Sequence, residues 1–162
     1  MSFLYDKKRV VLLLLAAFWC VVIFMLSAEN ADDSSQTSRG LIEAVCEWIV
    51  PDFDDFTGNE RAEFIESLQF AVRKCAHFTA YSVLGILSWS ALYDMKKRYR
   101  YACAVGFGFV YACSDEIHQL FVPERSGEFR DVLIDTSGAM LGTLIALGAT
   151  VLLVRMRKRR DI

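Results

Sequence analysis

Residues 111–142, YACSDEIHQLFVPERSGEFRDVLIDTSGAMLG, bring two apolar segments together across a short polar link. Both segments carry polar side chains into positions that we expect inside a membrane. The first segment ends with Asp115, Glu116 and Gln119, and the second begins with Asp131 and Asp135. An ionisable side chain within the hydrocarbon costs roughly 3 kcal/mol even on lenient insertion scales. A cluster of them therefore requires a functional or a structural reason.

The composition is typical of a membrane protein and argues against a small soluble one. Apolar types make up 54% of the 162 residues, and the mean hydropathy is positive. This length fits a single domain over residues 1–162. The five cysteines include no C-x-x-C pair, so neither a disulfide framework nor a zinc site is indicated, and we interpret them as packing residues.

The hydropathy pattern predicts an all-α fold with four transmembrane helices, at about 10–26, 70–93, 101–122 and 131–154. A cleaved signal peptide is the alternative for the first segment. We favour a retained helix, because the run is long for a signal peptide and Leu26 occupies a position where cleavage after Ala28 would require a small residue.

The loop between the first two spans, residues 27–69, is strongly acidic. Apolar residues at 41–42, 45 and 48–49 recur at helical spacing, which predicts a short amphipathic helix on the membrane surface that ends at Pro51. A second helical pattern begins near Asn59 and is expected to continue directly into the second span.

Lys and Arg gather before the first span, in the turn at 94–100 and after the fourth span. Because basic flanks stay in the cytoplasm, both termini are predicted to be cytoplasmic. The 27–69 loop and the 123–130 turn, and with them the polar ends of the last three spans, are then extracytoplasmic.

Helical phase predicts that three polar faces meet at this outer end. Each face continues inward as a glycine face, which lets transmembrane helices approach closely. We therefore expect a polar pocket, open to the outside, above a glycine-lined base. The faces comprise Lys74, His77, Tyr81 and Gly85; Asp115, Gln119 and Gly108, with Glu116 at the flank; and Asp131, Asp135, Gly138 and Gly142.

The charges at this end nearly balance, because Arg73, Lys74, Arg125 and Arg130 oppose the four carboxylates. Two interpretations remain open. The residues could form a functional pocket, which we favour, or they could be ion pairs that only fix helix register. Tyr81 could equally be an ordinary bundle aromatic, and His118 an interfacial residue.

Three chemistries fit such a pocket. Arg and Lys could hold a phosphate-bearing head group. Glu116 or Asp115 could act with His77 as general acid and base. The carboxylates and His77 could instead bind a divalent cation, although the neighbouring Arg and Lys argue against this, so no metal is assigned.

Three motifs carry a resemblance: R-K-x-x-H-F-x-x-Y at 73–81, D-E-x-x-Q-x-F-x-P-x-R at 115–125 and D-x-x-x-D-x-x-G at 131–138. Together they resemble the VanZ-like family of small membrane proteins, found mostly in Gram-positive bacteria and named for a component associated with teicoplanin resistance. The chain departs from the family at Glu29, where Gln is common, and at Asp135, where Asn is frequent. The resemblance implies signature positions at Lys74, His77, Tyr81, Asp115, Glu116, Gln119, Arg125 and Asp131.

Our leading hypothesis is an envelope role that lowers susceptibility to teicoplanin-type lipoglycopeptides, and the resemblance itself implies no particular reaction. We expect the protein to bind or alter a lipid-linked wall precursor or surface polymer, with membrane lipids and neither a cofactor nor nucleic acid as partners. Arg73, Lys74 and Arg125 would hold the head group, with Tyr81, Gln119, Asp131 and Asp135 also binding, while Glu116, Asp115 and His77 would transfer protons. The alternative is a structural or partner-binding membrane protein without catalysis.

Overall fold

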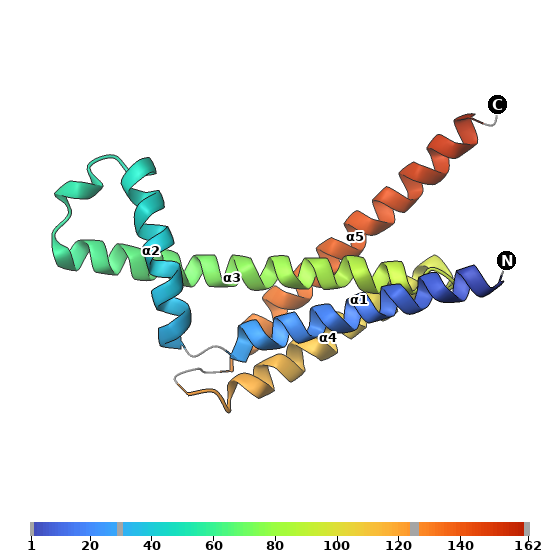
Figure 1. Ribbon diagram of the computed structural model, residues 1–162, viewed down its shortest axis with the longest axis horizontal. Helices are drawn as coiled ribbons and strands as arrows, with labels where there is room; N and C mark the ends of the chain where they lie inside the picture. The colour runs from blue at the N-terminus through green and yellow to red at the C-terminus, as the bar shows by residue number, and fades with distance from the viewer. Residues whose placement is uncertain (1, 29–30, 124–126, 161–162) are drawn as a thin grey trace.

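The computed structural model describes the backbone of residues 2–28, 31–123 and 127–160, in which helices are joined by short turns and no strand occurs. The elements are α1 (Ser2–Ala28), α2 (Ala31–Ile49), a 3₁₀ turn η1 (Phe53–Asp55), α3 (Gly58–Ala91), α4 (Lys97–Gln119) and α5 (Phe129–Arg160). Helices α1, α3, α4 and α5 form a bundle, while α2 stands across the start of α3 (Figure 1). The predicted all-α class is confirmed.

A helix covers most of each predicted span. Two helical stretches, Lys7–Ala28 and Phe129–Arg160, are long and apolar enough to cross a membrane by length and composition. Helices α3 and α4 do not meet this criterion, because charged and polar side chains interrupt their apolar stretches. Length and composition thus support two of the four predicted spans.

Helix α3 runs without a break from Gly58 to Ala91, as the pattern from Asn59 predicts. A capping box fixes its start: the Thr57 hydroxyl accepts from the Glu60 backbone N–H, and the Glu60 carboxylate accepts from the Thr57 N–H. The Thr57 hydroxyl also donates to the Glu60 carboxylate, at 2.7 Å. This bond, together with the one from the Thr57 N–H, holds the pKa of Glu60 below its ordinary value.

Glycines bring α3 and α5 into backbone contact, as predicted. A Cβ atom at Gly138 would collide with the Phe78 carbonyl, and one at Gly142 with the Ser82 carbonyl. From the other side, a Cβ at Gly85 would collide with the backbone of Ala139. Only glycine permits this approach, so these positions fix how the two helices cross.

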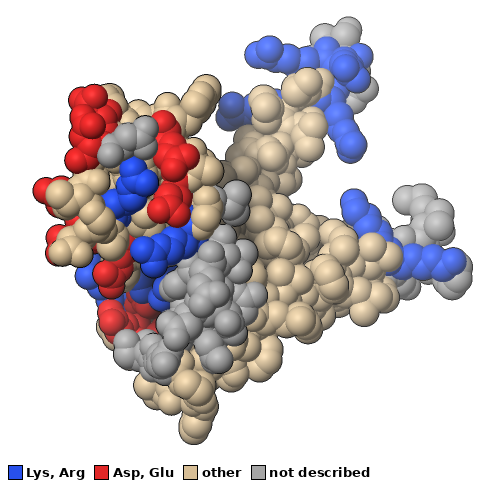
Figure 2. Space-filling view, turned by 60° about the vertical axis from the view of Figure 1, so that its left-hand side comes forward, with Lys and Arg blue, Asp and Glu red and all other residues tan. Residues whose placement is uncertain are grey.

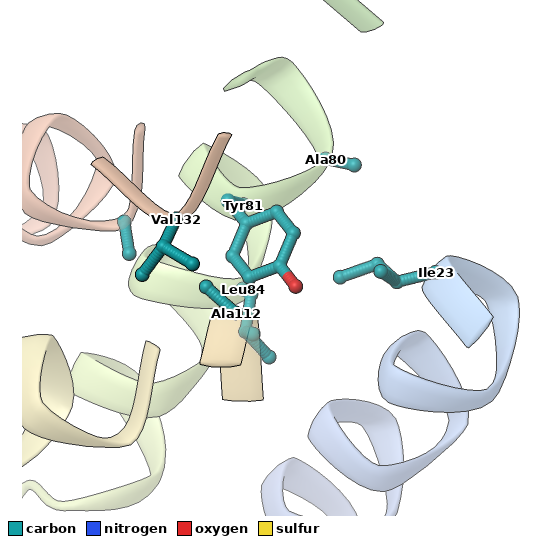
Figure 3. Packing of buried hydrophobic residues seen from close by; sticks show 7 residues of the cluster. Ile23, Ala80, Tyr81, Leu84, Ala112 and Val132 are labelled. Atoms are coloured by element: carbon teal, nitrogen blue, oxygen red, sulfur yellow. The ribbon is translucent and has the colours of Figure 1, made fainter. Parts of the chain in front are cut away.

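The core of the bundle lies directly beneath the polar end. The Tyr81 ring packs among Leu84 of the same helix, Ala112 of α4 and Val132 of α5, and its hydroxyl points toward the α1 side, where Ile23 lies (Figure 3). Helix α1 is held to the bundle by two hydrogen bonds, from the Trp19 indole N–H to the Ala80 carbonyl (2.8 Å) and from the Tyr111 hydroxyl to the Cys20 carbonyl (2.5 Å).

The amphipathic helix predicted near 41–49 exists, but it is longer than predicted and begins at Ala31. Ile42 and Cys46, one turn apart, pack with Phe53 and Ile65 against the start of α3. The other apolar residues of the predicted face, Val45, Trp48 and Ile49, are not buried within the protein, and 87% of Trp48 is accessible.

The remaining surface separates into zones. Large apolar side chains of α1, α4 and α5 are exposed, a pattern typical of an apolar interaction surface. Acidic and basic side chains gather together at the end formed by α2 and the start of α3, whereas basic side chains gather at the outer ends of α1 and α5 (Figure 2). The turn after α3 lies beside the start of α1, since Arg9 pairs with Asp94 at 3.4 Å.

Candidate functional site

The predicted polar side chains do come together, at the junction of α1, α3, α4 and α5. Asp115, in the last turns of α4, accepts a hydrogen bond of 2.7 Å at Oδ2 from the hydroxyl of Ser27, in the last turn of α1. Both residues are buried, and Asp115 is only 3% exposed. A charge-assisted bond of this length fixes the carboxylate and leaves its other oxygen, Oδ1, without a hydrogen bond among the described residues.

His77 of α3 lies at the centre of this junction. Its Nδ1 atom is 3.6 Å from Oδ2 of Asp135, a residue of α5 that is 1% exposed. One ligand-type atom from each of His77, Asp115 and Asp135 can be chosen so that all three lie within 4.8 Å of one another. We call these three residues the triad.

The remaining carboxylates have partners beside the triad. Asp131 forms an ion pair with Lys74, one turn before His77 on α3. Glu116 accepts a hydrogen bond from the backbone N–H of Glu128 (2.7 Å), which connects the last turns of α4 to the residue just before α5. The Gln119 side-chain amide also donates to Glu116, at 3.3 Å.

Tyr81 follows His77 by four residues, about one turn further along α3, and is fully buried. It is part of the apolar core, but its hydroxyl has no hydrogen-bond partner among the described residues and lies within electrostatic range of Asp115 and Asp135. An unpaired buried hydroxyl is uncommon in a packed core. Both interpretations of Tyr81 from the sequence therefore have an observation in their favour.

Arg73 does not join the cluster. It lines a cavity of about 390 Å³ between α2 and α3, and it forms no ion pair with the described residues. The cavity is lined by Arg39, Ala62, Ile65, Glu66, Gln69, Phe70 and Arg73. Since Arg73 precedes His77 by four residues, this basic cavity adjoins the triad along one face of α3.

Two other features differ from the predictions. Asp115, Glu116 and Asp135 are buried in the bundle rather than lining an open pocket, and α1 contacts Asp115 through Ser27. The charges also do not pair as a balanced set. Among the described Lys and Arg residues, only Lys74 forms an ion pair with a carboxylate of this cluster, and Arg130 is exposed. Arg125 and Glu29 lie outside the described residues.

His118 packs its ring against Phe24 of α1, with ring centroids 4.3 Å apart, which fits the interfacial interpretation. The sequence analysis missed two polar residues, Ser27 at the triad and Arg39 in the cavity. Ser27 could have been found as the first hydroxyl after the apolar run of the first span.

Most of the residues gathered here belong to the family motifs, and the match extends far beyond them. A model of the VanZ/LLP1 family matches residues 12–154. The chain belongs to the VanZ/LLP1 family. Comparison with curated proteins found no match, and comparison with solved structures found none.

Within this VanZ/LLP1 protein the junction offers two kinds of chemistry. The triad and Glu116 place proton-transfer groups, an imidazole and carboxylates, within one buried cluster. The cavity beside it offers the guanidinium groups of Arg39 and Arg73, which match the geometry of a phosphate.

Proposed function

We propose that this VanZ/LLP1 protein crosses the membrane four times, through α1, α3, α4 and α5, with both termini in the cytoplasm. The basic side chains near the start of α1, after α3 and at the end of α5 support this orientation. The interhelical hydrogen bonds of Trp19 and Tyr111 support a retained α1. The exposed apolar side chains of α1, α4 and α5 support lipid on the outside of the bundle.

In this orientation the triad and the basic cavity lie at the extracytoplasmic side, at the depth of lipid head groups. The protein binds the phosphate-bearing head group of a lipid-linked envelope component in the cavity, through Arg39 and Arg73. His77, Asp115 and Glu116 then exchange protons with the bound group. One observation carries this proposal: Arg73, which lines the cavity, lies four residues before His77 of the triad on α3.

By handling such a lipid the protein lowers susceptibility to teicoplanin-type lipoglycopeptides. Support for this consequence comes from the family resemblance and from the position of the site. The alternative is that the cluster only holds the helices in register, and the buried Ser27–Asp115 bond favours that role for at least part of it.

Lipid binding tests the proposal. The purified chain would be titrated with undecaprenyl phosphate and, separately, with undecaprenol, and binding measured by native mass spectrometry. We expect the phosphate form to bind and Arg73→Gln to weaken it about ten-fold or more, by loss of charge-assisted hydrogen bonds. Arg98→Gln is the matched control, since Arg98 is exposed near the start of α4. Equal binding of both lipids, or equal effects of both variants, would contradict the proposal.

A further inference from the structure

We propose that the triad of His77, Asp115 and Asp135 is a binding site for one divalent first-row metal ion, Zn²⁺ or Mn²⁺. The inference deepens the proposed function, since it assigns an ion to the same site. With the ion bound, His77 and Asp115 serve as ligands, and proton exchange with the head group falls to Glu116. The ion is measured without any lipid.

The first argument is geometric. The three residues come from three helices, and one ligand atom from each lies within 4.8 Å of the other two. Around a tetrahedral ion with bonds of about 2.0–2.1 Å, ligand atoms stand about 3.4 Å apart. The distance from His77 Nδ1 to Asp135 Oδ2 is already 3.6 Å. One of the three pairs therefore already stands near the spacing that an ion requires.

The second argument is the unsatisfied hydrogen bonding of the ligand atoms. Asp115 Oδ1 and Asp135 Oδ2 are buried and accept no hydrogen bond from the described residues. Ser27 occupies only the other oxygen of Asp115, Oδ2. A hydrogen bond to the outer oxygen of a ligating carboxylate orients it toward its ion, which is the arrangement expected around a bound metal.

The third argument is charge. Two ionised carboxylates this close and this deeply buried repel each other, and a cation between them removes the repulsion. The basic residues that seemed to oppose a metal in the sequence lie elsewhere: Lys74 pairs with Asp131, and Arg73 lines the neighbouring cavity. A divalent ion would balance both triad carboxylates.

The donor set selects the class of ion. One imidazole nitrogen with two carboxylate oxygens suits Zn²⁺ or Mn²⁺, whereas Ca²⁺ takes six to eight oxygen ligands and Cu(I) prefers sulfur. Three protein ligands also leave a coordination position open, as in catalytic sites. A bound ion of this kind acts as a Lewis acid toward a phosphate oxygen, which fits a head group held at Arg73.

Metal content tests the proposal. The full chain, purified in detergent with its thiols alkylated and stripped with a chelator, would be titrated with Zn²⁺ and Mn²⁺ separately. Bound metal would be counted by mass spectrometry after desalting. We expect one ion per chain in the wild type, and no stoichiometric ion in Asp115→Asn or Asp135→Asn. Asp94→Asn, at the opposite end of the bundle, should bind as the wild type does. In Ser27→Ala we expect affinity to fall about ten-fold.

A wild-type chain that takes up neither ion overturns the proposal, and so does full binding by both triad variants, since the ion then lies elsewhere. Size-exclusion profiles and helix content establish that each variant is folded. Should the triad variants fail to fold, the wild type decides: its melting temperature must rise with added ion and fall again with chelator. Arg73→Gln tests the two proposals separately. The proposed function predicts that this variant loses lipid binding, whereas the present inference predicts that it still binds the ion.

Discussion

Ser27 and Asp115 lie 88 positions apart in the chain and share a buried hydrogen bond of 2.7 Å. This bond joins the end of α1 to the end of α4 and closes the bundle over the triad. It makes α1 part of the site. It also orients the Asp115 carboxylate, which links the packing of the bundle to any chemistry at the triad.

Ser27→Ala removes this bond and leaves the Asp115 carboxylate without its hydroxyl partner. We expect the free energy of unfolding to fall by about 1–2 kcal/mol, near the upper range for hydrogen bonds between membrane helices, because the acceptor is ionisable. Thermal unfolding in detergent measures the effect. Ser114→Ala is the control, because the exposed Ser114 hydroxyl bonds only to the Tyr111 carbonyl of its own helix. Equal stability of the two variants would argue against the role of Ser27.

Gly142→Ala places a Cβ atom against the Ser82 carbonyl and forces α3 and α5 apart. Overpacking of this kind costs about 1–3 kcal/mol, and it should lower both the melting temperature and the amount of protein in the membrane. Gly148→Ala, on the same helix, meets no atom within 4 Å and should have no such cost. A harmless Gly142→Ala would mean that the two helices do not cross as described.

Lys74→Met leaves Asp131 with an unpaired charge in a mostly buried position. We expect destabilisation of about 2 kcal/mol, and we expect the double variant Lys74→Met/Asp131→Asn to recover much of it, because no charge is then left unpaired. A thermal-unfolding cycle over wild type, both single variants and the double variant measures the coupling. If the losses of stability in the two single variants simply add up to the loss in the double variant, the ion pair contributes nothing to stability.

The capping box of α3 predicts a pH effect outside the membrane. Hydrogen bonds from Thr57 hold the pKa of Glu60 below its ordinary value, so their contribution is fully present above the ordinary Glu pKa. It is lost as the pH falls through the lowered value, when the carboxylate takes up a proton. Hydrogen exchange in the first turn of α3 should therefore be better protected at pH 7 than at pH 3, after correction for the intrinsic rate. Glu60→Gln should lose this difference, whereas Glu63→Gln should keep it.

Features with a strong periodic signal could be predicted from the sequence. The glycines at 138 and 142 follow the polar residues of α5 on one helical face, and they do contact α3. The carboxylates of α4 and α5 were expected to meet His77 for the same reason, and Asp115 and Asp135 do lie beside it. The positions of polar residues around each helix are enough to predict which residues meet, because the polar faces of apolar helices pack toward one another.

Features that depend on tertiary packing could not be predicted. Arg73 and Lys74 are adjacent in sequence, but adjacent residues on a helix point about 100° apart, so Arg73 faces α2 while Lys74 faces α5. The cavity of Arg73 requires α2 to lie across α3, which no local pattern specifies. Ser27 carries no signal of its own, since a single serine after an apolar run is common. Its role depends on where α1 packs.

The central claim is that this buried cluster is a functional site and does more than fasten the helices together. The most direct test expresses the wild type and Glu116→Gln in a teicoplanin-susceptible Gram-positive host and measures membrane levels and drug susceptibility side by side. Glutamine can still accept the hydrogen bond from the Glu128 backbone, so the fold should be kept while proton transfer is lost. We predict that the wild type lowers susceptibility, and that the variant accumulates normally but does not. Loss of the variant from the membrane, or protection equal to that of the wild type, would contradict the claim.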